Sequence, residues 1–235
     1  MVFQCLYWLY DTDYFSDAGN GHSSCQDWLH PRNLFRVTLR TFEGVIRATS
    51  ATAHTSPLWI RPFVCRPRHG AKYGNPLTCG IFIIGTNPAT QMTLNFWSRF
   101  WAPGLGFDYT AWQAAYSKTT GGTCSPTRLN IDAIIHEVQA TTACGVLETN
   151  LYPYETPFRT KVPSLHRKTD VLEKLLQCIR PEVIVVHGAK ACRWVSAKRS
   201  SSPVSSAILL PSPHLSNKNL KWFATSLGQE AARNC

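Results

Sequence analysis

The chain has 235 residues, and 44% of them are apolar, which is ample for a packed core. Lys and Arg outnumber Asp and Glu by 24 to 14, so the formal net charge is +10 with His neutral. This charge favours an acidic partner such as nucleic acid, although an ordinary basic soluble protein can have the same balance. The chain has no GxGxxG, GxxxxGKS or GxxxxGKT motif, which argues against dinucleotide enzymes and phosphate-binding NTPases.

Residues 1–33 show no regular apolar period, and we predict an N-terminal extension there. Its apolar start, Met1–Tyr10, is interrupted by a Gln and followed by acidic residues, which fits neither a membrane span nor a signal peptide. Residues 34–235 are predicted to form a single α/β domain. This domain begins with a helix over Arg36–Ala51, and a loop rich in Pro, Arg and His follows over Ser56–Pro76.

Strands and helices are then predicted to alternate along the chain. Short apolar runs predict four strands, at Ile81–Ile84, Gly145–Asn150, Val183–Val186 and Ala207–Leu210. Amphipathic or apolar segments predict helices at Leu94–Phe100, Asn130–Glu137, Thr169–Cys178, Ala189–Trp194 and Leu220–Ala232. The alternation is typical of a three-layer α/β/α sandwich around a short central parallel sheet.

The turn after the first of these strands is the most informative segment. Ile81–Ile84 has no polar alternation, as expected for a strand that is buried on both faces. Gly85 permits a sharp turn and Pro88 fixes the chain direction, so Asn87 follows the carboxyl end of the strand. Ligands of open α/β sheets bind at this edge, although such a turn can also be purely structural.

Nine cysteines are scattered along the chain, and no CxxC pair occurs. Zinc and iron–sulfur sites usually have closely spaced ligands, so we expect no metal. The odd cysteine count and the missing secretory signal favour reduced thiols and a cytoplasmic protein.

Asn87, Asn150 and His214 follow three of the predicted strands, and this trio in this order resembles the uracil-DNA glycosylase superfamily. The likeness extends over about residues 79–232. Gly85-Thr86-Asn87-Pro88 resembles the first motif of the branches that have Asn where the uracil-specific enzymes have Asp. Further similar segments are Asn95-Phe96-Trp97, Gly106-Phe107, Gly145–Asn150, Arg180-Pro181-Glu182 and Pro213-His214-Leu215-Ser216.

The second catalytic motif departs from the family pattern. It fits with His214 at the His position and Leu215 in place of the usual Pro, whereas an alternative register puts Pro211 at that Pro. No counterpart of the iron–sulfur ligands of some branches can be identified, so we expect no cofactor.

The resemblance implies a role for each residue of the trio. Asn87 would hold the water that attacks the sugar, although it could instead cap its own turn. His214 would donate a hydrogen bond to the O2 side of the leaving pyrimidine, the alternative being an ordinary surface histidine. Asn150, with one acceptor and two donors, would recognise the base together with Thr86, although it could also be a structural residue at a strand end. An amide can face either way, so Asn150 alone does not separate uracil from cytosine.

Other residues are candidate DNA contacts. An aromatic residue after the first motif should stack on the flipped base, and we choose Phe96, although such clusters are usually core. Leu215 is at the position where the family inserts a wedge into the base stack. Candidate DNA-binding residues near it and on the preceding predicted helix are Ser216, Asn217, Lys218, Lys190 and Arg193.

Ala89 bears on the choice of base. Uracil-specific relatives have a bulky Tyr after the motif Pro, which blocks substituents on pyrimidine C5, whereas Ala89 leaves that space open. We therefore expect a monomeric, monofunctional DNA glycosylase that excises a 5-substituted pyrimidine from duplex DNA, for example glucosylated hydroxymethylcytosine of phage DNA in antiviral defence. The alternatives are a uracil or G:T/G:U mismatch repair glycosylase, a non-catalytic protein that binds modified DNA, and an unrelated α/β enzyme for small nucleotides.

Overall fold

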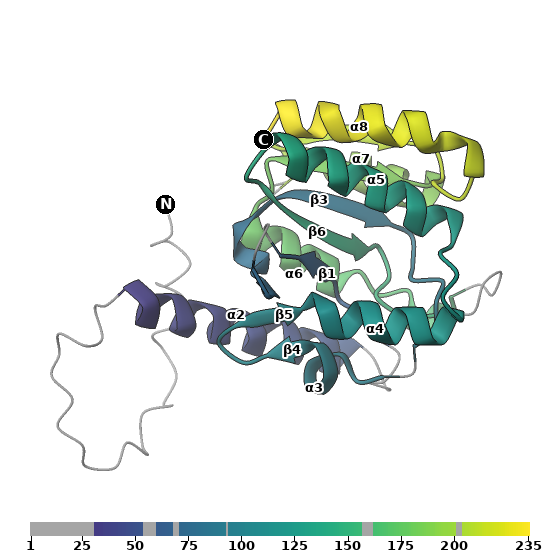
Figure 1. Cartoon of the computed structure of the whole chain (residues 1–235). Helices are drawn as coiled ribbons and strands as arrows, with labels where there is room; N and C mark the ends of the chain where they lie inside the picture. Colours follow the sequence, from purple (N-terminus) through teal and green to yellow (C-terminus); the bar gives the residue numbers. More distant parts are fainter. Residues whose placement is uncertain (1–30, 54–59, 68–70, 93, 157–161, 201–203) are drawn as a thin grey trace, which may run out of the picture.

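A five-stranded sheet forms the centre of the molecule (Figure 1). The computed structural model describes residues 31–53, 60–67, 71–92, 94–156, 162–200 and 204–235. The strands, in their order across the sheet, are β1 (Val64–Arg66), β6 (Gly145–Asn150), β3 (Cys79–Gly85), β7 (Val183–His187) and β8 (Ile208–Ser212). All neighbouring pairs are parallel except β1–β6, which is antiparallel.

The central position of β3 explains its uninterrupted apolar sequence. Its side chains alternate between two separate cores, with Ile81 and Ile83 in one and Phe82 and Ile84 in the other. The first core lies under α5 (Pro126–Thr141) and α8 (Lys221–Arg233), which cover one face of the sheet in Figure 1. The second core includes side chains of α2 (Pro31–Ala53), α6 (Asp170–Ile179) and α7 (Ala189–Lys198). The predicted α/β/α sandwich is thus confirmed.

Local sequence signals account for several helix ends. Ser125 caps α5 by accepting a hydrogen bond from the Arg128 amide, and Pro126 occupies the first turn. In α6 the apolar residues Val171, Leu172, Leu175 and Leu176 recur at the spacing of one helix face, and all four are buried. Where α5 meets α8, a Cβ on Gly228 would lie 2.7 Å from the Ile134 carbonyl oxygen, so only glycine permits this close approach.

Some elements were not predicted from the sequence. Strand β1 and the short β2 (Tyr73–Gly74) lie in or beside the predicted loop. β2 forms a small antiparallel sheet with β5 (Gly106–Asp108) and β4 (Trp101–Ala102). Helix α4 (Tyr109–Thr120) was also missed, and the helix predicted over 94–100 is shorter, as α3 (Phe96–Phe100). The missed strands β1, β2, β4 and β5 have only two or three residues each, which is too few for an alternating apolar pattern to be recognised.

Helix α2 begins earlier than predicted, at Pro31, two residues before the expected end of the extension. Its apolar side chains Leu39, Phe42 and Ile46 are buried in the second core. The predicted extension, apart from residues 31–33, lies outside the described residues. Within the described ranges, no helix combines the length and the apolar character needed to cross a membrane.

Candidate active site

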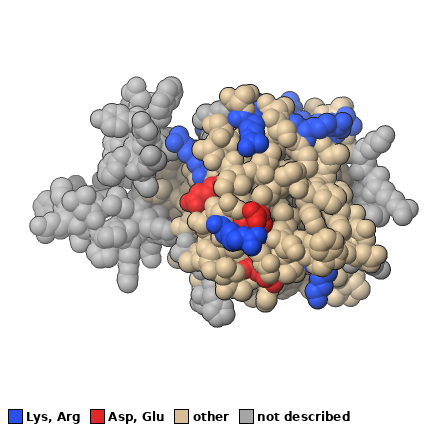
Figure 2. Space-filling view, turned by 90° about the horizontal axis from the view of Figure 1, so that it is seen from above, with Lys and Arg blue, Asp and Glu red and all other residues tan. Residues whose placement is uncertain are grey.

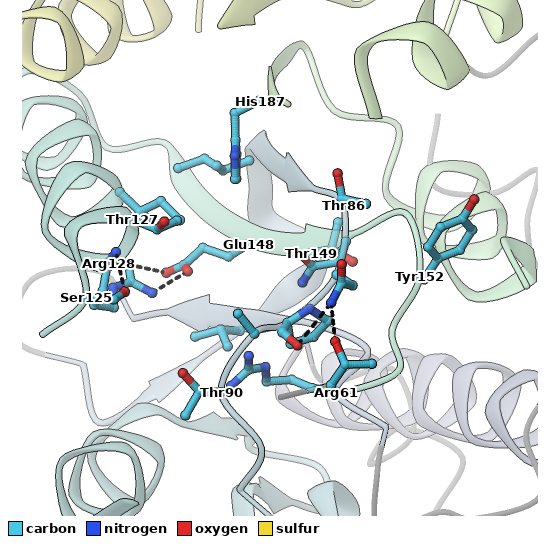
Figure 3. Close-up of a pocket in the computed structure, with 18 of the residues that line it drawn as sticks. Arg61, Thr86, Thr90, Ser125, Thr127, Arg128, Glu148, Thr149, Tyr152 and His187 are labelled. Atoms are coloured by element: carbon cyan, nitrogen blue, oxygen red, sulfur yellow. Dashed lines mark hydrogen bonds and ion pairs between the residues drawn. The ribbon is translucent and has the colours of Figure 1, made fainter. Parts of the chain in front are cut away.

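A cavity of about 770 Å³ opens where the parallel strands end (Figure 3). The turns after β3, β6, β7 and β8 all contribute to its wall, because the carboxyl ends of parallel strands meet at one edge of a sheet. The rest of the wall comes from the region around β1, from α4 and from the start of α5. The sequence predicted a site at this edge of the sheet. Seven of the predicted site residues line the cavity, namely Thr86, Asn87, Ala89, Asn150, Lys190, His214 and Ser216.

The side-chain amide of Asn87 has a defined orientation. Its Nδ2 donates a hydrogen bond to Thr156 Oγ1 at 2.7 Å and lies 3.4 Å from the Pro88 carbonyl oxygen. A backbone carbonyl oxygen can only accept hydrogen bonds, so it is Asn87 Nδ2, and not Oδ1, that faces Pro88 and Thr156. Among the described residues, no group donates a hydrogen bond to Asn87 Oδ1.

Hydrogen bonds tie the turn of Asn87 to the segment after β6. The Leu151 amide donates to Gly85 O at 2.8 Å, and the Thr156 amide donates to Pro88 O at 3.1 Å. Farther along, the buried Glu155 carboxylate accepts from the Met92 amide at 2.8 Å. The two segments therefore form one rigid unit, which explains why their side chains converge.

Gly85 leaves room for two side chains of the site. A Cβ at this position would lie 2.8 Å from Asn150 Oδ1 and 2.9 Å from His187 Nε2. Both atoms thus lie beside the backbone of β3, and any larger residue at 85 would displace them. His187 also lines the cavity, although it belongs to no motif that was recognised in the sequence.

His214 lies at the exposed rim of the cavity. Its imidazole is 5.5 Å from that of His187, measured between ring centroids, in an edge-to-face arrangement. A Cβ on Gly188 would be 3.3 Å from His214 Cδ2 and 3.4 Å from Thr86 Oγ1, so both side chains lie against the turn after β7. The structure therefore brings His214 to the site.

Two predicted contacts are wrong, because their side chains are buried in cores. Phe96 is 2% exposed and packs edge-on against Phe63 at 5.1 Å and parallel to Phe107 at 5.6 Å, so it presents no face to a flipped base. Leu215 is 0% exposed and belongs to the core under α5 and α8, so it cannot insert into DNA from this position. Asn130 fixes this loop by donating to the carbonyl oxygen of Leu215 at 2.8 Å.

The remaining predicted DNA contacts differ in position. Lys190 lines the cavity, with its ammonium over the Tyr152 ring at 5.1 Å. Arg193 and Asn217 are exposed but do not line it, and the side chain of Lys218 is outside the described part. On the face shown in Figure 2, Lys and Arg form separate groups rather than one continuous patch.

A buried ion-pair network on one side of the cavity was not predicted from the sequence. Arg128 donates to Glu148 through two nitrogens, at 2.6 and 3.0 Å, and both residues are 8% exposed (Figure 3). Arg128 also donates to Asp132 at 3.0 and 3.1 Å, and Asp132 pairs with Arg66. The helix predicted over Asn130–Glu137 did not include Arg128, which lies in the first turn of α5, and its pairing with a strand residue depends on tertiary packing.

One group among the described residues has suitably placed metal-ligand atoms, namely Cys144, Glu182 and Cys235. It precedes β6 and β7 and thus lies at the opposite edge of the sheet from the cavity. Cys144 and Cys235 are joined by a disulfide bond, so their sulfurs are engaged with each other. The prediction of reduced thiols is wrong for this pair.

Comparison with protein families decides between the possible enzyme classes. The model of the uracil DNA glycosylase superfamily matches residues 71–234 of the chain. The chain belongs to this superfamily. No curated protein matches the chain. Membership indicates a DNA glycosylase in general, a hydrolase that binds DNA, and the match includes every strand that borders the cavity except β1.

Proposed function

We propose that the protein is a monofunctional DNA glycosylase that hydrolyses the N-glycosidic bond of a flipped-out pyrimidine and leaves an abasic site. The orientation of the Asn87 amide is the observation that carries this proposal. With Nδ2 engaged by Thr156, the carbonyl oxygen Oδ1 is left to accept a hydrogen bond from a water molecule. A neutral amide is too weak a base to take the proton early, so it directs the water to C1′ as the sugar becomes cation-like.

The other residues of the site would act on the base. Asn150 would form hydrogen bonds with the Watson–Crick edge of the extrahelical pyrimidine. His214, at the rim, would donate a hydrogen bond to the departing base and so stabilise its developing negative charge. Such a reaction requires a positioned water and a stabilised leaving group, and we expect no cofactor.

The substrate that we propose is a pyrimidine with a substituent at C5. Ala89 is exposed in the cavity wall, where a methyl side chain takes up little of the 770 Å³. Mismatched thymine, hydroxymethylcytosine and glucosylated hydroxymethylcytosine of phage DNA are the candidates, and the last would give the protein a role in antiviral defence. Repair of uracil or of G:T and G:U mismatches is the alternative, and a further one is binding of modified DNA without catalysis.

Incubation with duplexes that carry different pyrimidines, including phage DNA with modified cytosine, tests both parts of the proposal. We expect alkali-labile abasic sites at a 5-substituted base with the native protein, and none with Asn87→Ala, which should retain DNA binding. Ala89→Tyr is the matched variant for the substrate, because it should retain only activity on uracil, if any.

The remaining outcomes separate the alternatives. Excision of unmodified uracil alone would contradict the substrate, and no excision of any base would favour the binding function. Strand cleavage without alkali would contradict the monofunctional reaction. It would implicate Lys190, the one lysine among the described residues of the cavity wall, as a Schiff-base nucleophile.

A further inference from the structure

His187 has a buried polar atom for which the described part of the chain provides no hydrogen-bond partner. The residue ends β7, is 5% exposed and lines the cavity, and in Figure 3 its ring extends into the cavity. Its Nδ1 has no hydrogen-bond partner among the described residues. A buried polar atom without a partner costs free energy, and at functional sites such an atom is often satisfied by a ligand.

The neighbours of His187 fix its ring beside the base-recognition residue. Its Nε2 and Asn150 Oδ1 both lie within 2.9 Å of the same point, the Cβ position that Gly85 leaves vacant. The ring also makes an edge-to-face contact with that of His214, at 5.5 Å between the ring centroids. His187 is therefore held in place before any ligand binds, which lowers the entropy cost of a contact.

The imidazole is neutral over the physiological pH range. Burial and, second, the charge of His214 lower the pKa of His187 to about 3. A neutral imidazole has one N–H donor and one lone-pair acceptor, so it can pair with either a carbonyl or an amino group of a base without bringing a charge into the cavity.

We propose that His187 is a base-contact residue, whose Nδ1 forms a hydrogen bond with a polar group on the edge of the extrahelical pyrimidine, beside the contact from Asn150. This inference rests on the proposed function. Asn150 ends β6 and His187 ends β7, the two strands that flank β3, so both residues line the cavity at the same edge of the sheet. A second contact, from a ring that is already held in place, would add to the affinity for the extrahelical base that the amide of Asn150 alone provides.

Binding to duplexes that resist hydrolysis tests this contact. The probes are 15-mer duplexes with a central 2′-fluoroarabino analogue of uracil or of 5-hydroxymethylcytosine, and a plain duplex with a C:G pair is the control. His187→Phe keeps an aromatic ring without polar atoms, whereas His187→Asn restores a polar atom near the place of Nδ1. We expect His187→Phe to bind the preferred analogue about five- to tenfold more weakly than the native protein. We expect His187→Asn to recover most of this loss, and all three proteins to bind the plain duplex equally.

A second measurement does not depend on the variants. In the native protein labelled with ¹⁵N, the Nδ1 resonance of His187 should shift when the preferred analogue duplex is added and stay unchanged with the plain duplex. Equal affinity of His187→Phe and the native protein, or an unmoved Nδ1 resonance, would overturn the contact while base excision continued. If the native protein neither excises any base nor prefers an analogue, the proposed function fails first, and this inference fails with it.

Discussion

At the residue scale, the hydroxyl of Thr156 decides which end of the Asn87 amide faces the cavity. Thr156 is 2% exposed and belongs to the segment that is hydrogen-bonded to the turn of Asn87. Its Oγ1 accepts from Asn87 Nδ2, and the longer contact of Nδ2 with Pro88 O alone would hold the amide less firmly. Thr156 is thus a positioning residue for the proposed reaction.

Thr156→Val removes this hydroxyl while keeping the shape of the side chain. We expect the single-turnover rate of base excision to fall about tenfold, in line with the loss of one orienting hydrogen bond, with duplex affinity nearly unchanged. Thr156→Ser should retain most of the rate. A parallel loss of rate and affinity in Thr156→Val would show a general structural role instead.

The depressed pKa of His187 also predicts how stability depends on pH. The folded protein binds a proton at His187 only near pH 3, whereas the unfolded chain binds one near its ordinary value of 6.5. Between pH 3 and pH 6.5 the unfolded state binds more protons than the folded state. The free energy of unfolding that neutral His187 contributes is therefore fully present above pH 6.5 and is lost as the pH falls toward 3. Within this window, each pH unit should lower the free energy of unfolding by up to about 1.4 kcal/mol.

Urea unfolding at pH 7.5 and pH 5 measures this effect. The native protein should lose more unfolding free energy between the two pH values than His187→Phe, because only the native chain has the titrating imidazole. Equal losses in both proteins would show that His187 does not carry this part of the acid sensitivity.

At the element scale, the Arg128–Glu148 ion pair connects α5 to β6 beside the cavity. Both charges are buried, so removal of one partner leaves the other without compensation. The Arg128 guanidinium also lies over the Trp112 ring of α4, at 5.6 Å from the ring centroid. This single side chain therefore joins three elements of the cavity wall.

Arg128→Met should lower the free energy of unfolding by about 3–5 kcal/mol, because Glu148 is then a buried, unpaired carboxylate. The double variant Arg128→Met/Glu148→Leu should recover much of this loss. Arg233→Met, which breaks the exposed helix pair with Glu230, should cost less than about 1 kcal/mol. Urea titrations monitored by circular dichroism give all three values, and a loss no larger than that of Arg233→Met would refute the structural role of the Arg128–Glu148 pair.

At the scale of the whole molecule, the disulfide bond between Cys144 and Cys235 ties the last residue of the chain to the start of β6, across 91 positions. It anchors the end of α8 to the sheet at the edge opposite the cavity. A bond across so long a segment stabilises the fold mainly by restricting the unfolded chain.

Cys235→Ser should lower the free energy of unfolding by about 2–4 kcal/mol when the protein is oxidised. In the presence of a reductant the variant and the native protein should be equally stable. Cys124→Ser, at an exposed free cysteine, is the control and should have no effect in either condition. Base excision should persist in both variants, and an unchanged stability of oxidised Cys235→Ser would contradict the role of the bond.

Local sequence patterns were enough to predict the layers of the fold and the edge of the sheet where the site lies. Apolar runs such as those of β3 and β7 are strong local signals, because a strand buried on both faces excludes polar residues throughout. The turns that follow such strands must meet at one edge, so Asn87, Asn150 and His214 could be placed together before any coordinates.

Which side chains face the cavity could not be predicted from local sequence, because it depends on long-range packing. Phe96 and Leu215 have sequence neighbours that fit a DNA contact, yet the packing of distant aromatic and helical residues buries both of them. Thr156 and the Arg128–Glu148 pair had no local signal, because their partners are 69 and 20 positions away. For His187 Nδ1, the described part of the chain offers no partner at all. Strand periodicity is local and survives in the sequence, whereas burial and side-chain pairing at the site are set by elements that meet only in the folded chain.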